Sequence, residues 1–431
     1  MGGWFCISPN GRATAGGFWI SIAMLLGLVV LGCGSDAPQS GAGAAAIPPS
    51  TGVPDTAGPT DPGGPSGWTI QELFRVGSVR GEEGLVAFGQ VSGVELDEGG
   101  NLYVLDALTK VVHRFGPDGE PLRAMGGLGR GPGEFRDPNG LLITSDGRLW
   151  VLDPTGMRYT AFGPGGAVAG TYRRAFSAGW DNSWDAVALE DGTIYEPTTI
   201  FAPGSEEIIP VILGLREGHG LMLPVDTFLM PQPLDPATWN VAPSQSASGP
   251  IISGWVPVPF SPESRVRLDP RGGYWAGTTG APKFTRITWN GDTLQVIENV
   301  GAELRPITGR DRELAVRDLS DRFGEGLQAD LSQVPDLMPY WQEFWVDHLG
   351  RLWVERFRPP GTSVVQPHEW EIYGPGGDYL GLLRLPLVGS PVPVLRKDRL
   401  AGVVRDELDV DQVVVFELTA GGQGGTAPDE R

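Results

Sequence analysis

The sequence predicts an all-β protein, a six-bladed β-propeller of four-stranded antiparallel blades with a short helical insertion. Three observations lead to this fold class: a repeat with a fixed offset, short strands of alternating apolar residues, and recurring glycine turns. The repeat is clearest where Gly100–Asp106 returns as Gly147–Asp153, at an offset of 47 residues, and each copy is followed by Phe-Gly-Pro-x-Gly. A period of this length, made of short strands, is typical of stacked β-units.

The first complete unit shows how one blade is built. Alternating segments at 93–97, 102–105 and 110–115 are separated by turns, and residues 122–125 provide a fourth strand. Short turns that contain glycine between such segments predict antiparallel hairpins. Four antiparallel strands in 40 to 50 residues predict a propeller blade.

Later units follow the same pattern. The turn glycines are Gly100, Gly147, Gly192, Gly273 and Gly350, spaced by 47, 45, 81 and 77 residues. The two long gaps indicate insertions, at about 203–260 and 305–335. A sixth unit ends the chain with three visible strands, and we expect residues 69–76 to supply the fourth, because that closes the ring and removes an open sheet edge.

The two insertions differ in composition. Residues 203–260 are rich in proline, whereas residues 308–332 have apolar side chains at every fourth position. Thr308 can cap a helix, with Asp311 three residues further on. We therefore expect a helix on the propeller rim between the fourth and fifth blades.

The N-terminal segment predicts export. Residues 1–32 contain an apolar stretch after Arg12, and Val30-Leu31-Gly32-Cys33 resembles the bacterial lipobox, so residues 1–32 are predicted to be a lipoprotein signal peptide and Cys33 the lipidated residue. Residues 33–66 are predicted to be a disordered linker, 67–420 the propeller, and 421–431 a disordered tail. The alternative is a plain membrane anchor or a secreted protein in which Cys33 is incidental.

Charge and the N-terminal segment bound the location and the partners. The net charge of -20 argues against nucleic acid as a partner. We expect a cell-envelope protein, anchored by lipid at the outer membrane or the periplasmic face, whose contact with the membrane is the lipid alone.

With the blades laid out, a family resemblance emerges. Gly129–Phe135, followed by Pro138 and Leu149–Asp153, resembles the NHL-type repeat, and residues 68–418 as a whole are similar to bacterial six-bladed β-propeller proteins that are often exported or lipid-anchored. Gly350–Val354 and Asp406–Val410 match segments of that pattern. The resemblance implies the fold and assigns no activity, because a propeller hosts many unrelated functions.

The candidate ligand-binding residues lie just before the innermost strands or flank such positions, and we expect them at the mouth of the central channel. Polar groups set among aromatic side chains suit a sugar or a peptide. The alternative is that these residues serve blade-to-blade packing around a solvated funnel. The candidates are Ser92, Asn139, Trp180, Trp184, Asp185, Arg265, Tyr340, Trp341 and Glu343.

Two recurring features are better explained by folding than by chemistry. Asp106 and Asp153, with Glu196 and Glu355 at equivalent points, could ring a cation, but a position that recurs from blade to blade favours hydrogen bonding to turns. The Gly129–Gly133 loop lacks the following Lys-Ser/Thr or helix of a phosphate loop, so it predicts a connection between blades.

No metal site or cofactor is predicted from the sequence. The four histidines, His113, His219, His348 and His368, have no metal-ligand spacing. A serine nucleophile elbow is also missing, and lipidation of Cys33 leaves the mature chain without a cysteine nucleophile.

We therefore expect a binding module for a protein, peptide or glycan rather than an enzyme. The alternative is a divalent-cation-dependent hydrolase or lyase resembling propeller lactonases, with calcium held by Asn139, Asp185 and Glu343. Convergence of their oxygens within about 5 Å would favour that enzyme, and capping by Arg265 would argue against it. A structural subunit of an envelope complex is the third possibility.

Overall fold

The computed structural model describes residues 68–78, 86–176, 184–201, 207–234, 236–244, 252–299, 301–323, 327–363, 365–406 and 408–420. The predicted signal peptide, Cys33, the linker, Trp180 and the C-terminal tail lie outside these residues.

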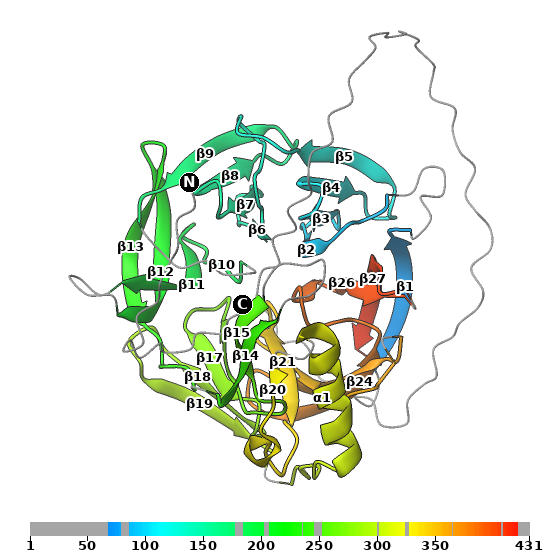
Figure 1. Ribbon diagram of the computed structural model, residues 1–431. Helices are drawn as coiled ribbons and strands as arrows, with labels where there is room; N and C mark the ends of the chain where they lie inside the picture. Colours follow the sequence, from blue (N-terminus) through cyan, green and yellow to red (C-terminus); the bar gives the residue numbers. More distant parts are fainter. Residues whose placement is uncertain are drawn as a thin grey trace, which may run out of the picture.

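Six groups of four antiparallel strands stand as blades around a central axis in the described part of the chain (Figure 1), which confirms the predicted fold class. Blade 1 consists of β2 (Val91–Leu96), β3 (Leu102–Asp106), β4 (Val111–Phe115) and β5 (Pro121–Gly126). Blade 2 consists of β6 (Gly140–Ile143), β7 (Leu149–Asp153), β8 (Arg158–Phe162) and β9 (Val168–Arg174). Blade 3 consists of β10 (Val187–Ala188), β11 (Ile194–Phe201), β12 (Ile208–Gly218) and β13 (Leu221–Leu229). The outer strands of blades 2 and 3, β9 and β13, also pair in parallel and join these two blades into one eight-stranded sheet.

The remaining blades complete the ring. Blade 4 consists of β16 (Ser264–Leu268), β17 (Tyr274–Thr278), β18 (Lys283–Ile287) and β19 (Thr293–Glu298). Blade 5 consists of β21 (Trp341–Val346), β22 (Leu352–Arg356), β23 (His368–Tyr373) and β24 (Tyr379–Leu385). Blade 6 consists of β25 (Val394–Arg396), β26 (Arg399–Arg405), β27 (Asp411–Ala420) and β1 (Trp68–Val76).

Strand β1 closes the ring, as the sequence predicts. It pairs antiparallel with β27, from Trp68 opposite Ala420 to Val76 opposite Val413. The N-terminal strand therefore becomes the outermost strand of the last blade, and it covers an edge of β27 that would otherwise be open.

Strand β3 shows why the alternating pattern builds this fold. All five of its residues are buried. Leu102 and Val104 pack in a core shared with blade 6, whereas Tyr103 and Leu105 pack in a core shared with blade 2. Because successive side chains of a strand point to opposite faces, one strand serves two inter-blade cores.

The glycine turns end the inner strands on one face. Gly100 and Gly147 have φ angles of 79° and 76°, a left-handed conformation that favours glycine. Their N–H groups donate to the carbonyls of Asp97 at 3.0 Å and Thr144 at 2.8 Å. We name the face with these turns the lower face, and the face where the inner strands begin the upper face.

The two insertions meet in one small subdomain, which we name the cap. It contains β14 (Thr238–Ser244), β15 (Ile252–Pro257), α1 (Gly309–Phe323), β20 (Leu327–Gln328) and a 3₁₀ helix, η2 (Leu331–Gln333). β14 pairs with both β15 and β20, and Trp239 and Val241 share a core with Ile307, Ala315 and Met338. Both insertions run from an outer strand to the next inner strand, which places the cap on the upper face, over blades 4 and 5 (Figure 1).

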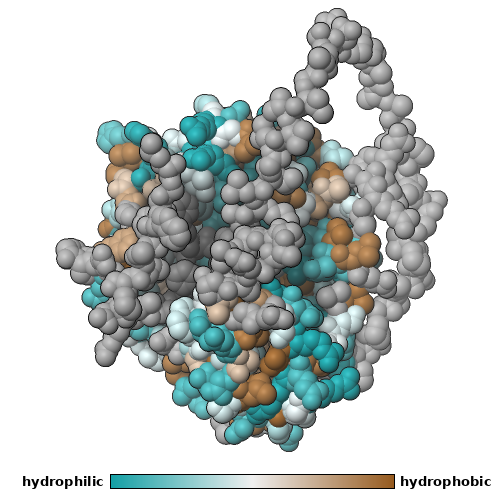
Figure 2. Space-filling view, viewed as in Figure 1, coloured by the Kyte–Doolittle hydropathy of each residue, from teal (hydrophilic) through white to brown (hydrophobic). Residues whose placement is uncertain are grey.

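Helix α1 begins where the sequence predicts. Thr308 and Asp311 exchange hydrogen bonds, from the Thr308 N–H at 2.9 Å and from the Asp311 N–H at 3.3 Å. This reciprocal pair is a capping box with aspartate in place of glutamate. The outward side of the helix is hydrophilic (Figure 2), and its inward residues, among them Ala315, pack in the core of the cap.

Two predicted boundaries are wrong. The helix ends at Phe323, and Leu327–Gln328 form a strand instead of its continuation. The proline-rich insertion was predicted to start near residue 203, but β12 and β13 belong to blade 3. Pro224 is tolerated there because β13 is the outermost strand of its blade, and its pairing with β9 on the outer side covers only Leu221 and Met222.

Candidate functional site

The inner strands of all six blades enclose a central cavity of about 180 Å³. Its upper part is lined by residues near the strand starts, including Ser92, Asp185 and Ser390. Its lower part is lined by residues near the strand ends, including His348 and Arg396. This volume is below the range of about 300–1,000 Å³ typical of drug-sized ligands, so the cavity admits a small molecule or one group of a larger one.

Three charged side chains from three successive blades meet in the upper part of the channel. Arg267 on β16 contacts Asp185, which precedes β10, with Nη1 2.7 Å from Oδ2. Its Nη2 lies 2.8 Å from Oε2 of Glu343 on β21. Its Nε donates to the carbonyl of Phe344 at 3.1 Å. Arg267 is therefore fixed by groups from both neighbouring blades.

Burial sets the electrostatics of this cluster. Desolvation raises the pKa of Glu343, while Arg267 and Arg265 act in the opposite direction. Burial also opposes the charge on Arg267, but the carboxylates of Asp185 and Glu343 outweigh it and raise the pKa of Arg267. Arg265 lies further out, 2.6 Å from Glu263 and 3.9 Å from Glu343. Arg267 rather than Arg265 thus caps the two carboxylates.

The polar sequence candidates take different positions. Ser92, Asp185 and Glu343 lie around the channel, but Ser92 and Glu343 stand within β2 and β21 and not just before these strands. The Ser92 hydroxyl is buried and has no hydrogen-bond partner among the described residues. Asn139 instead connects blades through its backbone: its N–H donates to Leu152 and its carbonyl accepts from Trp184, both at 3.1 Å.

The aromatic candidates do not form a ligand platform. Tyr340 and Trp341 are buried between blades 4 and 5, where the Trp341 indole donates to the carbonyl of Ala281 at 2.9 Å. The Trp184 indole is buried in the core shared by blades 2 and 3 and donates to Glu196 at 2.7 Å. The side chains of Trp184, Tyr340 and Trp341 therefore serve packing between blades, which is the alternative that the sequence leaves open for them.

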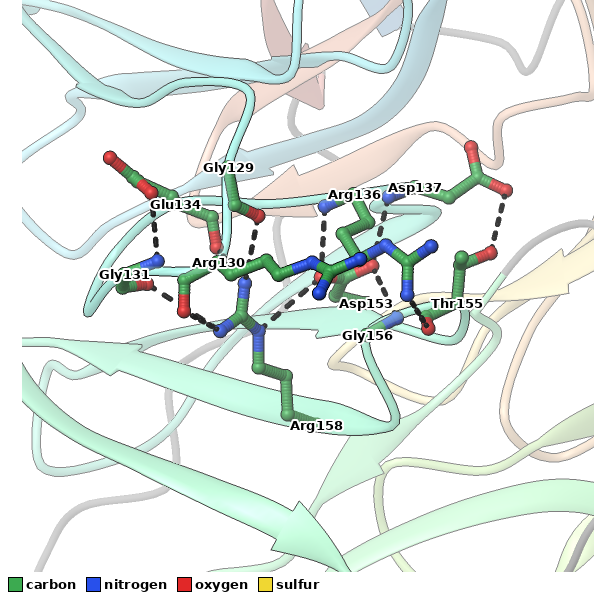
Figure 3. A network of polar contacts seen from close by, with 10 residues as sticks. All are labelled: Gly129, Arg130, Gly131, Glu134, Arg136, Asp137, Asp153, Thr155, Gly156 and Arg158. Carbon is green, nitrogen blue, oxygen red and sulfur yellow. Dashed lines mark hydrogen bonds and ion pairs between the residues drawn. The ribbon is translucent and has the colours of Figure 1, made fainter.

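The recurring aspartates are folding residues, as their recurrence predicts. Asp153 accepts hydrogen bonds from the N–H groups of Arg136 at 3.0 Å, Asp137 at 2.8 Å and Gly156 at 3.0 Å (Figure 3). Asp106 makes equivalent contacts with Gly89 and Gln90. Each aspartate thus links, by hydrogen bonds, the segment that precedes its blade with the turn that follows the second strand.

The glycine-rich loop 129–135 is held by the same network. The guanidinium of Arg158 donates to the carbonyls of Gly129 at 3.4 Å, Arg130 at 2.9 Å and Glu134 at 2.5 Å (Figure 3). Gly133 has a φ of 79°. The carbonyls thus face the protein's own arginine, and the loop connects blades 1 and 2.

Glu196 and Glu355 depart from the aspartate pattern. Glu196 is buried and accepts from Tyr159 at 2.9 Å, Arg174 at 2.9 Å and Trp184 at 2.7 Å. Glu355 contacts Gln342 at 2.7 Å and the imidazole of His368, whose second nitrogen faces Arg358. Each of these buried carboxylates thus has its hydrogen-bond partners among the side chains around it.

Sequence reasoning missed Arg267, Glu95 and Arg396, all of which line the cavity. A signal for Arg267 was present: it lies two residues after Arg265, and alternate residues of a strand share a face. The structure offers no comparable local signal for Glu95, because its environment is made by blade 6.

The three residues proposed as calcium ligands do not leave room for a cation. Asp185 and Glu343 both hold Arg267, so a guanidinium lies where a divalent cation would have to bind. The set Asn139, Asp185 and Glu343 does not fit calcium in this arrangement. Within the described ranges, no group of three or more His, Cys, Asp or Glu residues could hold a metal ion, and no helix is long and apolar enough to cross a membrane.

Comparison with known proteins yields structural likenesses only. No protein-family model matches the sequence, and no curated protein matches it. Among solved structures, the chain is similar to an exported-protein candidate from Bacteroides fragilis (TM-score 0.46, 12% identity, covering 84% of this chain and 98% of that one). It is also similar to virginiamycin B lyase from Staphylococcus aureus (0.38, 11%, 81% and 99%) and to a gluconolactonase from Xanthomonas campestris (0.39, 11%, 83% and 92%). Likenesses of this degree carry no argument about what this protein does.

Proposed function

We propose that the protein is a binding module of the cell envelope, anchored by lipid at Cys33, that holds a protein, peptide or glycan segment at the upper mouth of its channel. The observation that carries the proposal is the position of Arg267 between Asp185 and Glu343. Because both carboxylates are occupied by one guanidinium, the mouth offers a fixed, charge-compensated polar surface. Such a surface recognises a ligand by hydrogen bonds and shape.

The cap supports a role for the upper face. Its two insertions begin and end at the face where Asp185 and Glu343 lie. Phe357, which follows β22 of blade 5, packs against Phe260 with ring centroids 6.0 Å apart, and this contact holds the cap on the propeller. A cap beside the channel gives a bound segment a second wall.

The test is titration calorimetry of the full chain with short peptides and oligosaccharides, before and after Arg267→Met. We expect the variant to lose binding at least tenfold, because the ion pairs that order the mouth are gone. The control is Arg271→Met, which breaks a similar pair, with Asp269 at 2.8 Å, at the lower-face turn of the same blade. Binding that survives Arg267→Met, or that both variants lose equally, contradicts the proposed site.

The second candidate is the cation-dependent hydrolase or lyase. Two carboxylates within reach of one point are the observation that favours it, provided that Arg267 can leave that point. The measurement is the midpoint of thermal unfolding with calcium and with a chelator. A saturable rise with calcium that Asp185→Asn abolishes would favour the enzyme, whereas an unchanged midpoint supports the binding module.

A further inference from the structure

Glu95 is a buried carboxyl group on the wall of the channel that lies opposite Arg267 of blade 4. It lies on β2 of blade 1, lines the cavity and is 8% exposed. Its Oε2 has no hydrogen-bond partner in the part of the chain that the structure describes. Buried polar atoms are nearly always paired, so an unpaired oxygen at a cavity wall indicates a place where a ligand completes the hydrogen bonding.

The ion-pair partner of Glu95 is too far away to satisfy this oxygen. Nη2 of Arg396 on β25 lies 3.9 Å from Oε2, beyond hydrogen-bond distance. A group that both donates and accepts can bridge such a pair, donating to Glu95 and accepting from Arg396. Primary amides, hydroxyl groups and water have this property.

Ser92 adds a second acceptor to the same wall. Its Oγ is buried and finds no hydrogen-bond partner among the residues that the structure describes, and the residue lines the cavity. Ser92 is the extra residue where the β2–β3 register shifts between Val91 and Gly93. Bulges of this kind re-aim a side chain, here at the channel.

The charges around the channel are mixed and favour a neutral ligand. A cation would meet the arginines and an anion would meet the carboxylates, so either would face like charge. The titratable and charged residues around the cavity and its mouth are Glu95, Asp185, Glu263, Arg265, Arg267, Glu343, Asp347, His348 and Arg396.

We propose that the blade 1 wall is a subsite for a small neutral ligand with a primary amide, which donates a hydrogen bond to Glu95 and accepts one from Arg396, while a second N–H group of the same ligand donates to Ser92. The subsite deepens the proposed function and rests on it: the upper mouth holds the peptide or glycan segment, and one of its amide groups enters the channel.

The experiment compares three probes of nearly equal size: neutral N-acetylglycinamide, anionic N-acetylglycine and cationic N-acetylethylenediamine. Titration calorimetry of the full chain should show at least tenfold tighter binding of the neutral amide, and Glu95→Gln should weaken it at least tenfold. The control Glu98→Gln, at an exposed turn residue that pairs with Lys397, should leave binding unchanged. Ser92→Ala, which removes only the second acceptor, should weaken binding by a smaller factor.

A proton readout separates a ligand contact from a structural role. Burial raises the pKa of Glu95 to about 7, so the group is partly protonated at neutral pH. A ligand that donates to the carboxylate favours its ionised form, and binding should release a fraction of a proton. Titrations in phosphate and in Tris measure this release, and Glu95→Gln should abolish it.

The outcomes distinguish the two proposals. Equal affinity for the three probes, no binding of any probe, or unchanged affinity in both Glu95→Gln and Ser92→Ala overturns the subsite, and then only water bridges Glu95 and Arg396. If Arg267→Met still abolishes binding of the longer peptides and oligosaccharides, the proposed function survives that result. If Arg267→Met leaves such binding intact, the proposed function fails, and with it the subsite that rests on it.

Discussion

Asp153 and Glu95 are both buried carboxylates on strands of adjacent blades, and they differ in how their oxygens are used. Asp153 accepts from three backbone N–H groups and from Arg158, whose Nε lies 3.4 Å away (Figure 3). Glu95 keeps one oxygen, at the wall of the cavity, for which the described residues supply no hydrogen-bond partner. The first carboxylate is completed by the chain, and the second is left open.

The difference teaches how to separate folding residues from binding residues in a repeat fold. A buried carboxylate with every acceptor satisfied joins loops, and its removal leaves donors without partners. A buried carboxylate with a free oxygen costs free energy in the isolated protein, and a ligand can recover that cost. Recurrence along the sequence marks the first kind, since Asp106 repeats the contacts of Asp153, and position in the channel marks the second.

The largest effect is expected for Asp153→Ala. The substitution leaves Arg158 and three backbone donors without their acceptor in a buried site, so the free energy of unfolding should fall by about 3–5 kcal/mol. Urea denaturation measures it. The control is Asp137→Ala, whose exposed side chain pairs with Lys110 at 3.1 Å and should cost less than about 1 kcal/mol. Equal losses in the two variants would remove the distinction between completed and exposed carboxylates.

Glu95→Gln should raise the free energy of unfolding at neutral and alkaline pH, whereas Asp153→Ala lowers it. The folded pKa of Glu95 is raised from 4.5 to about 7, because burial disfavours the charged form. The stability it contributes is therefore present below pH 4.5 and lost as the pH rises to about 7, at about 1.4 kcal/mol per pH unit, or about 3 kcal/mol in all. The glutamine variant does not titrate there.

Denaturation at pH 5 and pH 8 compares the two proteins. The variant should gain up to about 3 kcal/mol relative to the wild type between these values. Glu98→Gln is the control, and it should show no such gain. If wild type and Glu95→Gln lose stability in parallel, Glu95 is not the titrating group and the contrast with Asp153 does not hold.

The architecture could be predicted because its determinants are local. The offset between Gly100 and Gly147, the alternation in Leu102–Asp106 and the capping pair Thr308 and Asp311 are all visible in short stretches of sequence. β1 was also predictable, since the last unit showed only three strands. Blade 3 was misread because Pro210 and Pro224 resemble a loop, whereas a long hairpin tolerates them in β12 and β13.

The site could be predicted only in part, because it depends on contacts between blades. Asp185 and Glu343 were found from their predicted position just before inner strands, but their shared partner Arg267 comes from a third blade. Tyr340 and Trp341 follow the same positional rule and still turn into the core. Whether an oxygen such as that of Glu95 is left open depends on residues about 300 positions away, and no sequence pattern records this.

The smallest effect is expected for Asp106→Asn, and it sharpens the comparison by its pH dependence. Burial alone would raise the pKa of Asp106, but hydrogen bonds from Gly89, Thr109 and Gln90 outweigh it and lower the pKa below 3.8. Its stability contribution is therefore present above pH 3.8 and lost as the pH falls through the folded pKa. The amide should weaken these charge-assisted hydrogen bonds and cost about 1.5–3 kcal/mol at pH 7, with a smaller difference near pH 3. Urea denaturation at both values measures the two differences. The free energy of unfolding should thus depend on pH in opposite directions through Asp106 and through Glu95. If the cost of Asp106→Asn grows toward acid pH, Asp106 is not an ionised carboxylate whose hydrogen bonds the chain completes.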